Sequence, residues 1–131
     1  MIVNFYFSGR LYADFVFEMN DYLLDAYFPA RNCSGFNIQT NTVAVHMEGV
    51  IQAYRLADDL KEKDRAACYR TFIREGADFT MDLQVTSTAN IFEDEAVGGF
   101  RENPNSFIMR VDYNQHAVTA LMEGYEVGIL V

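Results

Sequence analysis

The sequence of 131 residues predicts an α+β fold, in which helices pack on one face of a mainly antiparallel sheet. Two observations lead to this prediction. Apolar and polar residues alternate in several short stretches, a period of two that is typical of strands. One long stretch is instead rich in Ala, Leu, Lys, Arg and Glu, which are strong helix formers. Half of the residues are hydrophobic and 22% are charged, so we expect residues 1–131 to form a single globular domain.

The first alternating stretches predict a hairpin. Apolar residues occupy every second position over 3–7 and again over 11–19. A short helix is expected over 21–28, with Asn20 as its N-cap. The sequence leaves open a second interpretation, in which the whole of 11–28 is helical.

The middle of the chain predicts a strand, a long helix and another strand. Val43, Val45 and Met47 alternate with polar neighbours. The helix is expected over 50–75, with a break between Lys61 and Asp64 where Asp64 caps the second piece. Alternation then resumes over 79–85, which is the clearest strand pattern in the sequence.

The last third of the chain predicts a long loop followed by a strand, a helix and a final strand. The loop spans 88–105 and contains Gly98-Gly99, which favours a turn. We expect a strand over 107–113, a helix over 114–123 and an apolar strand over 125–131.

Two parts of the sequence resemble each other at a fixed distance of sixty-four residues. The heptapeptide ADFVFEM at 13–19 is followed by ADFTMDL at 77–83. This echo suggests an internal duplication of 13–60 and 77–124, each unit consisting of strand, long loop, strand and helix in one shared sheet. The alternative is that amphipathic strands resemble one another because their period demands it.

The charge of the chain is strongly negative and unevenly distributed. Ten basic and nineteen acidic residues give a net charge of −9, yet the stretch from Arg55 to Arg74 has six basic and four acidic residues. The remaining sequence therefore has four basic and fifteen acidic residues, a net charge of −11. Such a surface repels phosphate backbones, so we expect no direct binding of nucleic acid and instead a basic protein partner. The simpler explanation is that the net charge only keeps the protein soluble.

Membrane, metal and cofactor sites are not expected. No apolar run has the roughly 18 to 20 residues that a membrane span needs, and the first residues lack a leader pattern, so we expect a cytoplasmic protein. Cys33 and Cys68 fall in different predicted elements and are interpreted as free thiols. The two histidines are also scattered, and no phosphate loop or catalytic motif occurs. The sequence therefore favours a protein without enzymatic activity, cofactor or metal.

The predicted long loop supplies the main candidate binding site. Closely spaced carboxylates flanked by aromatic rings can imitate phosphates toward a basic surface, with the rings as anchors. The function expected from this site is to dock a basic partner and to inhibit a protein that handles nucleic acid. The alternative is a solvated acidic loop without a role. The candidate residues are Phe92, Glu93, Asp94, Glu95, Phe100 and Glu102.

A second candidate site lies on the polar face of the predicted sheet. His46 and Glu48 on one strand would neighbour Arg110 and Asp112 on another. Such a cluster could bind an anionic ligand or supply an acid and a base, as in a small-ligand-binding protein or a modest enzyme. The alternative is a solvated face with cross-strand ion pairs. A homodimer that pairs exposed edge strands is a further alternative that the sequence leaves open.

Overall fold

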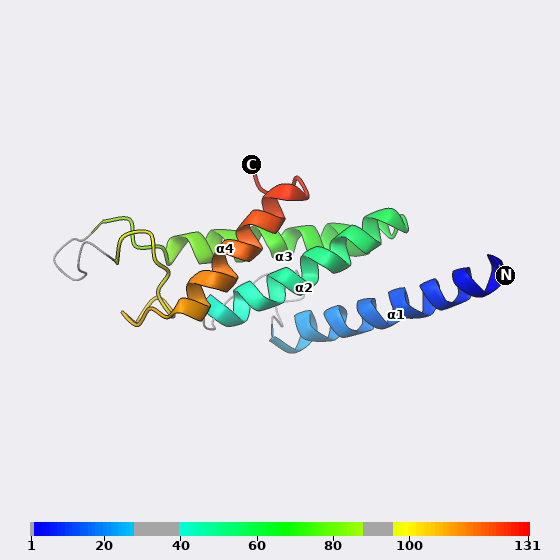
Figure 1. The fold of residues 1–131 in the computed structure, drawn as a ribbon, viewed down its shortest axis with the longest axis horizontal. Helices are drawn as coiled ribbons and strands as arrows, with labels where there is room; N and C mark the ends of the chain where they lie inside the picture. Colours follow the sequence, from blue (N-terminus) through cyan, green and yellow to red (C-terminus); the bar gives the residue numbers. More distant parts are fainter. Residues whose placement is uncertain (1, 28–39, 88–95) are drawn as a thin grey trace.

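The computed structural model of this protein is built from α-helices (Figure 1), and the structure describes residues 2–27, 40–87 and 96–131. In these ranges there is no sheet, and two isolated bridges are the only strand-like pairings. The predicted α+β fold is therefore wrong, and the protein is all-helical. The four helices of the described residues are α1 (Ile2–Tyr27), α2 (Thr40–Asp59), α3 (Lys63–Asp82) and α4 (Val111–Glu126).

Burial along α1 explains why the predicted hairpin is a helix. The apolar residues that alternate over 11–19 do not share one face: Ala13 and Phe17 are buried, whereas Leu11 and Phe15 are exposed. Residues two apart on a helix point about 200° from each other. The apparent period of two thus comes from two helical stripes on opposite faces of α1, interleaved in the sequence. The interpretation of 11–28 as helix is confirmed over the described part.

Helix α2 replaces the predicted strand at 43–47 for the same reason. Val43 and Met47 are completely buried, but Val45 between them is 43% exposed. The buried positions continue along α2 at intervals of three and four residues, which is the spacing of one helix face. They include Val43, Met47, Val50, Tyr54 and Ala57.

The turn from α2 to α3 occurs where the sequence predicts a break. Lys61 adopts a left-handed conformation with φ of 62°, and the amide of Glu62 donates to the carbonyl oxygen of Ala57 at 2.9 Å. This is the usual way to end a helix. Glu62, not Asp64, occupies the N-cap position of α3. Helix α3 then continues to Asp82, so the predicted strand over 79–85 is wrong.

Helix α2 is central, because it contacts each of the other three helices. In Figure 1, α1 lies along the outer side of α2, and α4 crosses α2 and α3. The core between them is apolar. Its largest completely buried side chains include Phe17, Met47, Ile51, Tyr69, Phe72 and Ile73.

The remaining predicted strands are also absent. Residues 107–113 include the start of α4 at Val111, and Phe107 and Ile108 are exposed. The expected helix over 114–123 is confirmed within α4. The final residues form a turn at Gly128, where φ is +73°, and this turn brings Ile129 back into the core.

The proposed unit of strand, loop, strand and helix does not exist in this structure. The segment 13–60 contains most of α1 and all of α2, whereas 77–124 begins within the last turns of α3. A shared sheet related by a twofold axis is therefore excluded over the described residues. In the same ranges, none of the helices combines the length and the hydropathy that crossing a membrane would require.

Candidate functional site

The binding site predicted on the long loop is only partly described. Residues 92–95, which include Glu93, Asp94 and Glu95, lie outside the described residues. Phe100 is 2% exposed, so its ring is inside the protein and does not contribute to the surface. Glu102 is half-buried and accepts a hydrogen bond of 2.9 Å from the hydroxyl of Tyr113.

The four residues of the second predicted site do not share a face, because the sheet on which they were placed is absent. His46 and Glu48 are two positions apart on α2, about 200° around the helix. Glu48 bonds instead to Nδ1 of His116 at 2.8 Å. Arg110 pairs with its near neighbour Asp112 at 2.9 Å. Burial lowers the pKa of His46, which favours its neutral form.

The cysteine prediction is wrong for Cys68, which is disulfide-bonded. Cys33 lies outside the described residues. Within the ranges that the structure describes, no three or more His, Cys, Asp or Glu side chains are grouped so that they could hold a metal ion.

Helix α1 packs on the bundle through one narrow face, which we call the core face. Asn20 belongs to this face although it is polar, and its side-chain amide donates to the carbonyl oxygen of Val16 at 2.8 Å. The buried amide thereby has a partner within its own helix. The core face consists of Ala13, Phe17, Asn20 and Leu24.

A polar network fixes the rotation of α1 about its axis. Asp21 accepts hydrogen bonds from Arg65 at 3.2 Å and from the hydroxyl of Tyr69 at 2.6 Å, both on α3. The guanidinium of Arg65 also lies 4.4 Å from the centre of the Phe17 ring. At the other end, Arg10 bonds to Glu62 at 2.8 Å. Because these contacts lie on the side of α1 toward α3, they determine which side is left exposed.

The opposite side of α1 is covered by large apolar residues that are exposed. We call it the open face. Tyr12 is 72% exposed, and its neighbours on this face are also exposed. Single exposed apolar residues are ordinary, but a contiguous row of them on one helix marks an interaction surface. The open face consists of Leu11, Tyr12, Phe15, Met19 and Tyr22.

Four carboxylates follow one edge of the open face, at intervals of four, three and four residues. Two of them are engaged: Asp14 pairs with Arg10 at 3.0 Å, and Asp21 belongs to the network with Arg65. Glu18 and Asp25 are exposed and make no ion pair with any residue that the structure describes. We call this set, Asp14, Glu18, Asp21 and Asp25, the acidic row.

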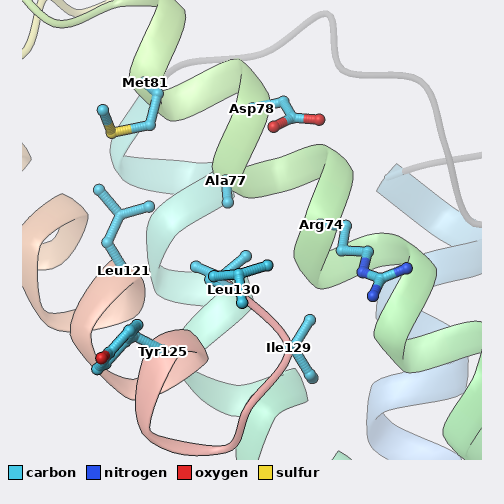
Figure 2. Close-up of a pocket in the computed structure, with 9 residues that line it drawn as sticks. Arg74, Ala77, Asp78, Met81, Leu121, Tyr125, Ile129 and Leu130 are labelled. Atoms are coloured by element: carbon cyan, nitrogen blue, oxygen red, sulfur yellow. The ribbon is translucent and has the colours of Figure 1, made fainter.

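A groove lies between α3, α4 and the C-terminal segment (Figure 2). It has a volume of about 510 Å³, with Ala77 and Leu130 near its middle and Arg74 and Met81 toward its two ends. Leu130, near the centre of the view, is one of the residues that line this groove. Its two charged residues, Arg74 and Asp78, have opposite sign, so the groove does not indicate the charge of a ligand. The surface of α1 is therefore the better-defined candidate.

Sequence reasoning missed the open face because it assigned the apolar residues of 11–19 to one side of a strand. The spacing of the exposed residues nevertheless indicates a helix. Tyr12, Phe15, Met19 and Tyr22 are separated by three, four and three residues, which is a helical interval. The carboxylates from Asp14 to Asp25 repeat at a similar interval.

Comparison of the chain with protein-family models, with curated proteins and with solved structures found no match.

Proposed function

We propose that this protein is a small acidic binding protein without enzymatic activity, which docks a basic protein partner on the open face of α1. The observation that supports the proposal is the position of five exposed apolar side chains beside the acidic row. Apolar and aromatic side chains supply most of the affinity at protein interfaces. Adjacent charge increases the association rate and selects partners of opposite sign. The exposed apolar side chains and the acidic row lie side by side on α1.

The distribution of charge favours α1 over α3. Helix α1 has four acidic residues and one basic residue, whereas α3 has four of each; α4, with three acidic residues and no basic one, has the same net charge as α1. A basic partner is therefore attracted toward α1 more strongly than toward α3. If the partner uses the same basic surface to bind nucleic acid, docking would block that activity, which is the inhibitory form of the proposal. A cytoplasmic location remains a prediction.

The proposal predicts that reversing the charge of Glu18 and Asp25 reduces partner capture at least tenfold. Immobilised wild-type protein and the double variant Glu18→Lys, Asp25→Lys are incubated with a cell lysate, and bound proteins are quantified by mass spectrometry. We expect basic proteins to be retained by the wild type, released in rising salt, and reduced at least tenfold on the variant. Long-range attraction between exposed charges weakens as salt is added, which explains the expected salt dependence.

A matched control separates the α1 surface from net charge. The double variant Asp78→Lys, Asp82→Lys makes the same change of charge at two exposed residues of α3. It should retain the partners of the wild type. If the amount of captured protein does not change with salt and is equal for the two double variants, docking on α1 is rejected. Reversal of Glu93, Asp94 and Glu95 tests the predicted loop site in the same assay.

A further inference from the structure

We infer that the element which docks on α1 is an amphipathic α-helix with Lys or Arg along one flank only, an inference that rests on the proposed function. Four residues of the open face and Ala26, which follows them on the same side of α1, form a row of exposed residues whose intervals are three, four, three and four. This is the spacing by which one helix packs along another in a coiled coil. We call the row, Tyr12, Phe15, Met19, Tyr22 and Ala26, the docking seam.

The seam has the length and the backbone chemistry that suit a helix. From Tyr12 to Ala26 it spans two heptads, or roughly 21 Å at 1.5 Å per residue. The backbone groups of α1 are bonded within the helix, so a peptide in extended conformation finds no edge on which to add a strand. A helix, by contrast, needs only the side chains of the seam. Helix-in-groove docking with anchors every three or four residues is a common mode of peptide recognition.

The two flanks of the seam differ, and this difference specifies the charge of the partner. On one side lie Glu18 and Asp25, seven residues apart and exposed. On the other side lie Val16 and Leu23, also seven apart, which are apolar and half-buried. A partner helix therefore needs basic residues at a seven-residue interval on the flank that meets Glu18 and Asp25. Basic residues on its other flank would be desolvated against Val16 and Leu23 without a counter-charge.

The same asymmetry argues against a second copy of this chain as the occupant. If two α1 helices packed antiparallel, the flank with Glu18 and Asp25 would meet its own copy, and like charges would face each other. If they packed parallel, Glu18 would meet the apolar flank near Leu23 of the other copy. Neither arrangement provides a counter-charge, whereas a basic helix does.

The inference is tested with three synthetic peptides of 22 residues and identical composition. All have Leu at the two apolar positions of each heptad, and each contains one Trp as a fluorescent reporter, since the protein contains none. The first places Lys on one flank of the apolar row, and the second places the same Lys residues on the side opposite the row. All three peptides contain a single Pro, which lies at the terminus of the first and second. In the third peptide, otherwise like the first, the Pro is moved to the centre, where it prevents a continuous helix.

We expect the first peptide to bind at least tenfold more tightly than the second or the third at physiological salt, and its helical circular dichroism to increase on binding. Phe15→Ser and the pair Glu18→Lys, Asp25→Lys should each weaken its binding at least tenfold. The control pair Asp78→Lys, Asp82→Lys should change it less than twofold. A version of the first peptide with Glu in place of Lys should bind the Glu18→Lys, Asp25→Lys protein and not the wild type.

Three outcomes would overturn the inference. Equal binding of the first and third peptides would show that no helix is needed, while the proposed function would still be judged by lysate capture. Equal binding of the first and second peptides would show that the position of the Lys residues on one flank is not required. A stable dimer in analytical ultracentrifugation that Phe15→Ser dissociates would show that a second copy occupies the seam.

Discussion

Tyr69 illustrates how a single polar group on α3 holds α1 in place. The residue is completely buried, and its hydroxyl donates a hydrogen bond of 2.6 Å to Asp21. Burial, followed by this hydrogen bond to a carboxylate, raises the pKa of Tyr69 well above its usual range. The neutral hydroxyl is thus strongly favoured in the folded state. Sequence patterns cannot identify such a contact, since Asp21 and Tyr69 are distant in the chain and lie in different helices.

Replacement of Tyr69 by Phe should lower the free energy of unfolding by about 1 kcal/mol at neutral pH, because one hydrogen bond is lost. The unfolded tyrosine titrates near pH 10, whereas the folded one remains neutral to higher pH. Its contribution is therefore complete below pH 10 and decreases by about 1.4 kcal/mol per pH unit above it. Urea denaturation at pH 8, 10 and 11 measures both effects.

The free energy of unfolding of the wild type should exceed that of Tyr69→Phe by less as the pH rises above 10, and this difference should change sign near pH 11. Tyr12→Phe is the matched control, because Tyr12 is exposed on the open face and should show almost no difference near neutral pH. A difference that stays constant from pH 8 to 11 would contradict the neutral, buried state of Tyr69.

Among the helices, the α2 and α3 pair shows most clearly what the sequence could and could not indicate. The break after α2 was predictable from local composition, because Asp58 to Asp64 contains several charged residues and no apolar stripe. The continuation of α3 past Gly76 was not predictable, since glycine commonly ends a helix. At Gly76 the structure gives a different reason for glycine: a methyl group at its Cβ position would lie 2.7 Å from Sδ of Met47. Tertiary packing, not helix termination, explains this glycine.

Gly76→Ala should therefore destabilise the protein by about 1 to 2 kcal/mol, because crowding against Met47 outweighs the better helix propensity of alanine. Gly9→Ala is the control, since nothing lies within 4 Å of that position on α1 and its side is exposed. This change should increase stability by up to about 1 kcal/mol. Thermal and urea unfolding measure both variants. Stabilisation by Gly76→Ala would show that α2 and α3 are packed less closely than described.

For the molecule as a whole, composition was informative and periodicity was misleading. The acidic charge follows directly from the sequence, and the helical content of the middle and of α4 was partly recognised, while the basic partner remains a prediction. The sheet was wrong because α1 is apolar on two opposite faces, so that residues two apart were all apolar. Short apolar runs allow both a strand and a helix. Only the packing of Ala13 and Phe17 on α2 and α3 distinguishes one face from the other.

The surface of α1 was likewise present in the sequence and was not recognised. A strand model assigns Phe15 and Phe17 to one buried face, which leaves no reason to look for a docking surface there. The helix separates them: Phe15 is 61% exposed and Phe17 is 2% exposed. All of the functional proposals depend on this separation, because the docking seam exists only if Phe15 points away from the bundle.

A comparison of Phe15→Ala and Phe17→Ala by urea denaturation tests this separation most directly. We expect Phe17→Ala to lower the free energy of unfolding by about 3 to 5 kcal/mol, as for a buried phenylalanine, and Phe15→Ala to change it by less than about 0.5 kcal/mol. Similar, large losses for both variants would place the two rings on one buried face and would contradict the two-faced helix.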